Sequence, residues 1–105
     1  MSKFVKDSNG VVSDYIAIGA SQAVAFTNVS SAESAAVGGN TTVVRIASDE
    51  DVHFVVGPTT QTATLNDAFL PANTPEYIGI DPGDVIAVIA PAGGAAGSFN
   101  IVEAA

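Results

Sequence analysis

The residue types that could carry out chemistry are concentrated in one short stretch, SDEDVHF, at positions 48–54. It contains three consecutive carboxylates, Asp49, Glu50 and Asp51, and His53 is the only histidine in the sequence. Carboxylates beside an imidazole can hold a divalent metal ion or act as a general acid/base pair. The stretch therefore raises the question of whether the chain has an active site or only an acidic turn.

The spacing of these residues favours a turn. A metal site needs ligands that converge, whereas three successive side chains diverge when the backbone is extended, and the spaced acids and central glycine of a calcium-binding loop are absent. Aspartate is common in turns because its carboxylate accepts hydrogen bonds from nearby backbone N–H groups. We expect a β-hairpin made of the strand TTVVRIAS, the turn DED and the strand VHFVVG. Metal binding or acid/base chemistry is the alternative interpretation.

Arg45 is the only basic residue after Lys6. In the expected hairpin it pairs with an acid or with the face of His53 on the adjacent strand. An exposed ion pair of this kind contributes about 0–1 kcal/mol. We expect Arg45 and His53 to make polar contacts with a partner, and a specific anion site at Arg45 is the alternative.

The remaining motifs do not predict catalysis. The glycine-rich run Gly93–Gly97 lacks the Lys-Ser/Thr of a phosphate-binding loop, and DPGD at Asp81–Asp84 has the composition of a turn. A nucleophilic serine or threonine needs a base, but the sequence has one histidine and no G-x-S-x-G motif. No pair of carboxylates is marked out for sugar hydrolysis. We therefore expect no enzymatic activity, no catalytic residue and no cofactor or metal.

The charge balance excludes some classes of partner. The 105 residues contain three basic and eleven acidic side chains, which give a net charge of −8. Such a chain repels the phosphates of nucleic acids and of anionic lipids, so we expect no direct binding to nucleic acid or membrane. Only 13% of the residues are charged, about half the usual fraction. This favours a surface that is partly covered by a partner, although many alanine and glycine residues also lower the charged fraction.

The order of short apolar runs and turn residues predicts an all-β chain. Val52, Phe54 and Val56 alternate with residues of the opposite face, as they do in a half-buried strand. The run DVIAVIA is apolar on both faces, as expected of a central strand. The predicted strands are Lys3–Lys6, Tyr15–Ile18, Ala23–Val29, Thr42–Ala47, Val52–Val56, Glu76–Ile80, Val85–Ala90 and Ser98–Val102.

About eight short strands with frequent turns are typical of a β-sandwich, a jelly roll or a small barrel. We expect a single β-sandwich or jelly-roll-like domain over residues 9–105. Residues 1–8 have a basic composition and form an extended N-terminal arm in this prediction. A short helix is expected at Ser30–Val37, with an ordered loop as the alternative, and a further short turn at Leu65–Phe69.

Three stretches, TTVVRIASDEDVHFVVG, LPANTPEYIGIDPGDVIAVIA and GSFNIVEA, resemble small virion proteins of tailed bacteriophages. Those proteins have a strand with Val-Arg, a turn, a strand with an aromatic residue and Val-Gly, and a Leu-Pro-Ala loop. Next come a strand with Glu-Tyr or Glu-Phe and a Pro-Gly-Asp turn into an apolar strand. The closing strand contains Asn, then Ile or Val, and Glu. The resemblance covers residues 41–104.

The resemblance implies a structural role as a capsid decoration, or cement, protein. Such a protein is made in the cytoplasm of the bacterial host, binds the outside of the assembled shell as a small oligomer, and reinforces it. The major capsid protein and further copies of the chain, in a dimer or trimer, are then the partners. The arm residues Lys3, Phe4, Val5 and Lys6 could add a strand to a shell protein.

Other roles stay open from the sequence. A head–tail connector, a tail component or a host-attachment part differs from a decoration protein in its copy number. A sugar-binding β-sandwich needs exposed aromatic residues for stacking, and the chain has no tryptophan and only two tyrosines.

Overall fold

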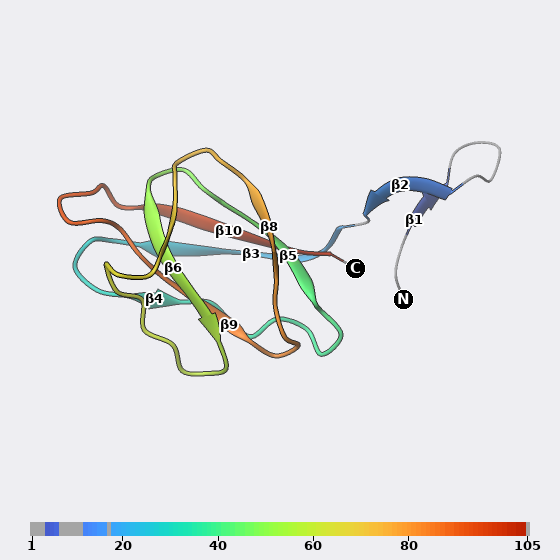
Figure 1. Cartoon of the computed structure of the whole chain (residues 1–105), viewed down its shortest axis with the longest axis horizontal. Coiled ribbons are helices and arrows are strands. Elements are labelled where there is room, and N and C mark those ends of the chain that lie inside the picture. Colours follow the sequence, from blue (N-terminus) through green and yellow to red (C-terminus); the bar gives the residue numbers. More distant parts are fainter. Residues whose placement is uncertain (1–3, 7–11, 17, 105) are drawn as a thin grey trace.

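The computed structural model describes residues 4–6, 12–16 and 18–104, with side chains from residue 20 to residue 104. Strand β1 (Phe4–Lys6) pairs antiparallel with β2 (Val12–Ile16) in a small sheet of their own. Figure 1 shows this pair as a separate ribbon from the other strands. Most of the predicted arm, including Lys3, lies outside the described residues, so the arm and the domain boundary after residue 8 stay predictions.

The other eight strands form two four-stranded sheets in which every pair of neighbours is antiparallel (Figure 1). Their order is β3-β10-β5-β8 in one sheet and β4-β9-β6-β7 in the other. Apart from the β6–β7 hairpin, successive strands lie in opposite sheets, and this order is that of a jelly roll. It confirms the predicted all-β sandwich. The strands are β3 (Ile18–Phe26), β4 (Ala32–Glu33), β5 (Val43–Ser48), β6 (Val52–Gly57), β7 (Ala68–Leu70), β8 (Glu76–Gly79), β9 (Val85–Ile89) and β10 (Gly97–Ala104).

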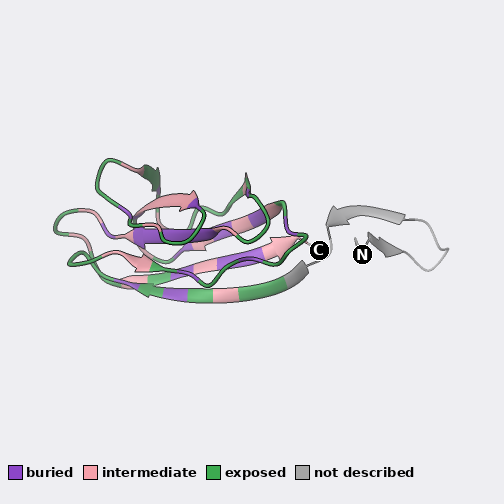
Figure 2. Cartoon of the chain, turned by 90° about the horizontal axis from the view of Figure 1, so that it is seen from below, coloured by how far each residue is buried: buried purple, intermediate pink, exposed green. Residues whose placement is uncertain are grey.

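Alternation along the strands places the core between the two sheets. In β5, Val44, Ile46 and Ser48 are buried, whereas the residues between them are half-buried on the outer face. Figure 2 shows the same alternation of buried and exposed residues along other strands. The core contains Val24, Phe26, Val37, Val44, Ile46, Val52, Leu70, Ile80, Ile86, Val88, Ala90, Phe99 and Ile101.

Strand β9 is buried on both faces, as its continuous apolar run predicts. Ile86 and Val88 belong to the core, and Val85 and Ala87 on the other face are also buried. The segment 58–67 between β6 and β7 reaches across to β4, where Gln61 N donates to the Glu33 carboxylate at 2.6 Å. Because β9 lies between β6 and β4, this segment crosses its outer face and covers it.

A side-chain amide closes the sandwich where the edge strands β3 and β4 meet. The Gln22 amide donates to the backbone carbonyl of Ala35 at 3.1 Å and accepts from its N–H at 3.0 Å. The Gln22 side chain thus forms with Ala35 the same pair of N–H···O=C hydrogen bonds that two paired backbone residues of antiparallel strands form. Farther along, Ala90 N donates to Thr27 O at 3.0 Å. The backbone N–H and C=O groups between β3 and β4 therefore have hydrogen-bond partners although the two strands do not pair continuously.

The predicted helix at Ser30–Val37 is wrong. The segment is extended and contains β4, which pairs with β9. Its backbone bonds go across the fold, with Ser34 N donating to Ile86 O at 2.8 Å and Val37 N to Asp84 O at 2.9 Å. A short segment pays the full cost of helix nucleation, and β9 offers partners for its N–H groups instead.

The turn predictions are confirmed at two glycines with positive φ. In DPGD, Asp84 N donates to Asp81 O at 3.0 Å and Gly83 has a φ of 83°. A proline followed by a left-handed residue is the pattern of a type II turn, which favours glycine at the second position. After β9, Gly93 has a φ of 74° in an equivalent turn. The turn expected near Leu65–Phe69 is present, where Asp67 N donates to Thr64 O at 3.1 Å, but β7 follows it immediately.

The predicted hairpin at SDED is wrong in one respect that changes the site. Strands β5 and β6 both exist, but they belong to different sheets and do not pair. Residues Asp49–Asp51 therefore form a corner that carries the chain from one sheet to the other. Alternation shows which residues of a strand point inward, but it does not identify the neighbouring strand.

Candidate binding surfaces

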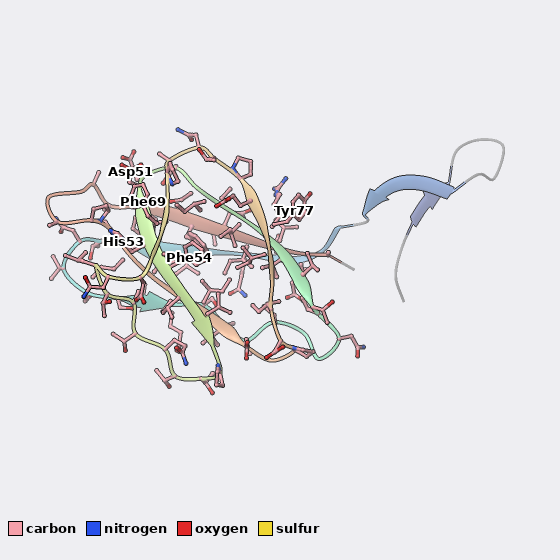
Figure 3. All side chains as sticks on the ribbon, in the orientation of Figure 1. Asp51, His53, Phe54, Phe69 and Tyr77 are labelled. Carbon is pink, nitrogen blue, oxygen red and sulfur yellow. The ribbon has the colours of Figure 1, made fainter. Side chains whose placement is uncertain are left out.

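The acidic corner uses its side chains to hold backbone groups of other segments. Asp49 Oδ1 accepts from Ser98 N, at the start of β10, at 2.8 Å. Asp51, labelled in Figure 3, accepts from Ala72 N, after β7, at 2.8 Å. The Ser48 hydroxyl donates to Glu50 O at 2.6 Å within the corner itself. These contacts explain Asp49 and Asp51 as structural hydrogen-bond acceptors.

The contacts of the corner lead to a stability prediction. Asp49→Ala and Asp51→Ala are each expected to lower the free energy of unfolding by about 1 kcal/mol, because each leaves a backbone N–H without its acceptor. Asp49→Asn and Asp51→Asn keep an acceptor oxygen and are the matched controls, with a smaller loss. Urea denaturation measures the four values. Equal losses for the alanine and asparagine variants would contradict the assigned role.

The described residues contain no group of three or more histidine, cysteine or carboxylate side chains placed to hold a metal ion. Within residues 4–6, 12–16 and 18–104 there is also no helix of the length and apolarity needed to cross a membrane. The two outer sheet faces present the side chains that a partner can contact.

One candidate is the outer face of the sheet β4-β9-β6-β7, which we call the His53 face. The His53 Nδ1 lies 3.0 Å from Asp67 O. Because a carbonyl only accepts, Nδ1 carries the proton, and in the neutral ring Nε2 is the free acceptor. The ring centroid of His53 lies 5.2 Å from that of Phe69, and Figure 3 shows the two side chains together at β6. The face consists of His53, Val55, Phe69 and Ile89.

The second candidate is the outer face of the sheet β3-β10-β5-β8, which we call the Arg45 face. Its residues are small or uncharged, with a single cation. No outward position of these strands carries a carboxylate within the part of the chain whose side chains are described. The face consists of Ser21, Ala23 and Ala25 on β3, Ser98, Asn100 and Val102 on β10, Val43, Arg45 and Ala47 on β5, and Tyr77 on β8.

Arg45 lies at the centre of one row of this face. Its cross-strand neighbours are Val102 on β10 and Tyr77 on β8. Tyr77 is 65% exposed, whereas Val102 is only 9% exposed. Among the described residues, the Arg45 Nε is a buried side-chain nitrogen without a hydrogen-bond partner. Arg45 thus presents a charged group that is already partly removed from water.

A shallow hollow of about 400 Å³ opens on the same face. Ala47, Ser98 and Asn100 form its floor, and Asn73 and Pro75 belong to the segment that borders it before β8. Ser48 and the carboxylate of Asp49 complete the lining, so the hollow combines small and polar side chains with one acidic group at its edge. It can accept a side chain or a short loop of a partner but does not enclose a small molecule.

The structure separates the two polar residues that the sequence placed together. Arg45 and His53 lie on the outer faces of different sheets, on opposite sides of the sandwich, so the expected contact across a hairpin is wrong. Neither residue is tested as a partner contact. Tyr77 and Asn100 were missed as site residues. Alternation could have placed both outward, but only the strand order brings them beside Arg45.

Comparison with protein-family models, with characterised proteins and with solved structures finds no match to this chain. The strand order, the two outer faces and the chemistry of their residues are therefore the observations from which a function is argued.

Proposed function

We propose that the chain is a structural protein of a tailed-phage particle, which binds the outer surface of the assembled shell and stabilises it without catalysis. The observation that carries this proposal is the Arg45 face. A chain with a net charge of −8 presents one broad sheet face without a carboxylate at any described outward position. Such a face favours contact with another protein over contact with water.

The chemistry of the Arg45 face suits repeated docking. Serine and alanine lose little side-chain entropy when they are covered, so ordering costs at the interface are small. On a shell, many modest contacts on neighbouring subunits combine into strong overall binding when the chain forms a dimer or trimer.

The phage resemblance supports the same proposal. Its three motifs correspond to β5, the corner and β6, then to the segment from the end of β7 through β9, and finally to β10. They therefore form most of the sandwich. Jelly rolls occur in viral capsid proteins and also in lectins, so the fold agrees with the proposal but does not select it.

A sugar-binding role is the second candidate, and Tyr77 is the observation that favours it. Its side chain is 65% exposed on the Arg45 face, directly opposite Arg45 on the neighbouring strand, and an exposed aromatic ring beside a polar group can stack on a sugar. A host-attachment or tail component is the corresponding place in the virion. A head–tail connector is the other alternative within the particle.

The copy number of the chain in purified phage particles tests the proposal. Quantitative mass spectrometry is expected to find it at a copy number comparable with that of the major shell subunit, and particles lacking it are expected to lose DNA at a lower temperature. A copy number far below that of the shell subunit indicates a connector, tail or attachment part instead. Absence from particles contradicts every virion role.

A further inference from the structure

We propose that the Arg45 face is the surface that docks on the shell, and that Arg45 meets a carboxylate of the shell subunit there. This inference rests on the proposed function and adds the docking face, its orientation and the charge of the partner. The His53 face then points away from the shell.

The first argument is the distribution of charge. Arg45 is the only basic residue after Lys6, in a sequence with eleven acidic residues. The four strands around it carry no carboxylate at their described outward positions. A partner carboxylate is repelled by most of this protein, including the Asp49 end of the hollow, but it is attracted at Arg45. Such a local reversal of sign favours one docking orientation over the others.

The second argument is the state of the guanidinium. The Arg45 Nε is buried and has no hydrogen-bond partner among the described residues. A buried polar group without a partner lowers stability, and part of the desolvation cost of binding is therefore already present in the free protein. A carboxylate can pair with a guanidinium through two parallel N–H···O bonds. A partner that offers such a carboxylate gains strong contacts at a small additional cost.

The third argument is the shape around Arg45. The row Ser21, Val102, Arg45 and Tyr77 crosses all four strands, and Tyr77 is the large side chain at its end. Tyrosine and arginine are enriched at the centre of protein interfaces and are frequent among the residues that dominate binding energy. The adjacent hollow of about 400 Å³ accepts a projecting side chain from the partner.

The opposite face is less suited to the same role. The segment 58–67 crosses the outer side of β9, and its residue Leu65 is 48% exposed. This makes the His53 face uneven. Its exposed aromatic residue, Phe69, is also 48% exposed, and it provides the matched control for a test on the Arg45 face.

The test uses particles assembled without the chain, from a phage in which its gene is interrupted. Purified full-length protein is added, and bound protein is measured after sedimentation of the particles. Relative to the unmodified protein, Arg45→Gln is expected to weaken binding about tenfold or more, and Arg45→Glu to abolish it. Arg45→Lys keeps the charge and is expected to bind at an intermediate level. Ala23→Tyr, which adds bulk on the same face, is expected to weaken binding.

Phe69→Ala is the control on the opposite face and is expected to bind like the unmodified protein. Thermal unfolding confirms that each variant is folded. If the unmodified protein binds and Arg45→Glu binds equally well, the docking face is wrong while the proposed function stands. If Phe69→Ala alone loses binding, the orientation is reversed and the inference is also wrong. If the unmodified protein does not bind particles, the proposed function and this inference fail together.

Discussion

Phe99→Ala is expected to lower the free energy of unfolding by about 3–5 kcal/mol, as large-to-small changes of fully buried aromatic residues do. Phe99 has an exposed fraction of 0% and lies on the inner face of β10, opposite Val24 on β3 and Ser48 on β5. Its ring centroid lies 6.3 Å from that of Phe54 on the facing sheet. The substitution therefore removes contacts within one sheet and between the two sheets.

A loss of this size is a large part of the roughly 5–15 kcal/mol that stabilises a domain, and it lowers the melting temperature by roughly 10–20 °C. Differential scanning calorimetry measures the change. Phe69→Ala is the control, because the same atoms are removed from a side chain that is 48% exposed on the outer face. Similar losses for the two variants would show that the core is not centred between the sheets as described.

Gly97→Ala is expected to cost about 2–3 kcal/mol, because the site has no room for a methyl group. A Cβ on Gly97 would lie 2.9 Å from Phe26 Cζ, 3.1 Å from Glu50 Cβ, and in contact with Asp49 Oδ1. The Phe26 ring is 2% exposed and cannot turn into solvent. The displaced Asp49 carboxylate also loses its bond to Ser98 N, so the substitution disturbs the acidic corner and the start of β10 together.

Gly79→Ala provides the matched control in another strand. A Cβ there meets only Thr42 O at 4.0 Å, which is ordinary contact, and alanine restricts the unfolded chain more than glycine does. This variant is expected to be as stable as the unmodified protein or slightly more stable. Chemical denaturation of both variants separates the two cases. A loss at Gly79 equal to that at Gly97 would mean that chain entropy, rather than crowding, controls both positions.

Local alternation predicted the strands that lie in the core. Phe99 and Ile101 in β10 and Val52 in β6 are all buried, because side chains at every second position of a strand point to the same face. Boundaries were less accurate. Strand β3 runs without a break from Ile18 to Phe26, where the sequence indicated the end of one strand and the start of another.

The pairing of strands could not be predicted in the same way. The three residues between β5 and β6 have the length and composition of a hairpin turn, yet they connect two sheets. What distinguishes the two cases is distant in sequence. Asp49 bonds to Ser98, and Asp51 bonds to Ala72, so the corner depends on segments that no local pattern connects to it.

For the candidate surfaces, too, the direction of a side chain is a local property of its strand, whereas its neighbours depend on strand pairing. In the structure, Arg45 lies with Val43 and Ala47 on the side of β5 opposite the core. The Arg45 face itself combines residues from four strands that are far apart in the chain. Its lack of carboxylates becomes visible only when those strands are placed side by side, so no motif in the sequence marks it.

The strand order also determines when this protein can fold during its synthesis. Strand β10 lies between β3 and β5, so neither can take its final place until Gly97–Ala104 has left the ribosome. Most other pairings also join distant segments, and such topologies fold slowly. Until then β3 and β5 present unpaired edges to the crowded cell, where exposed strands are prone to aggregate. Assembly of the sheet is therefore a single late event, rather than a stepwise process that follows translation.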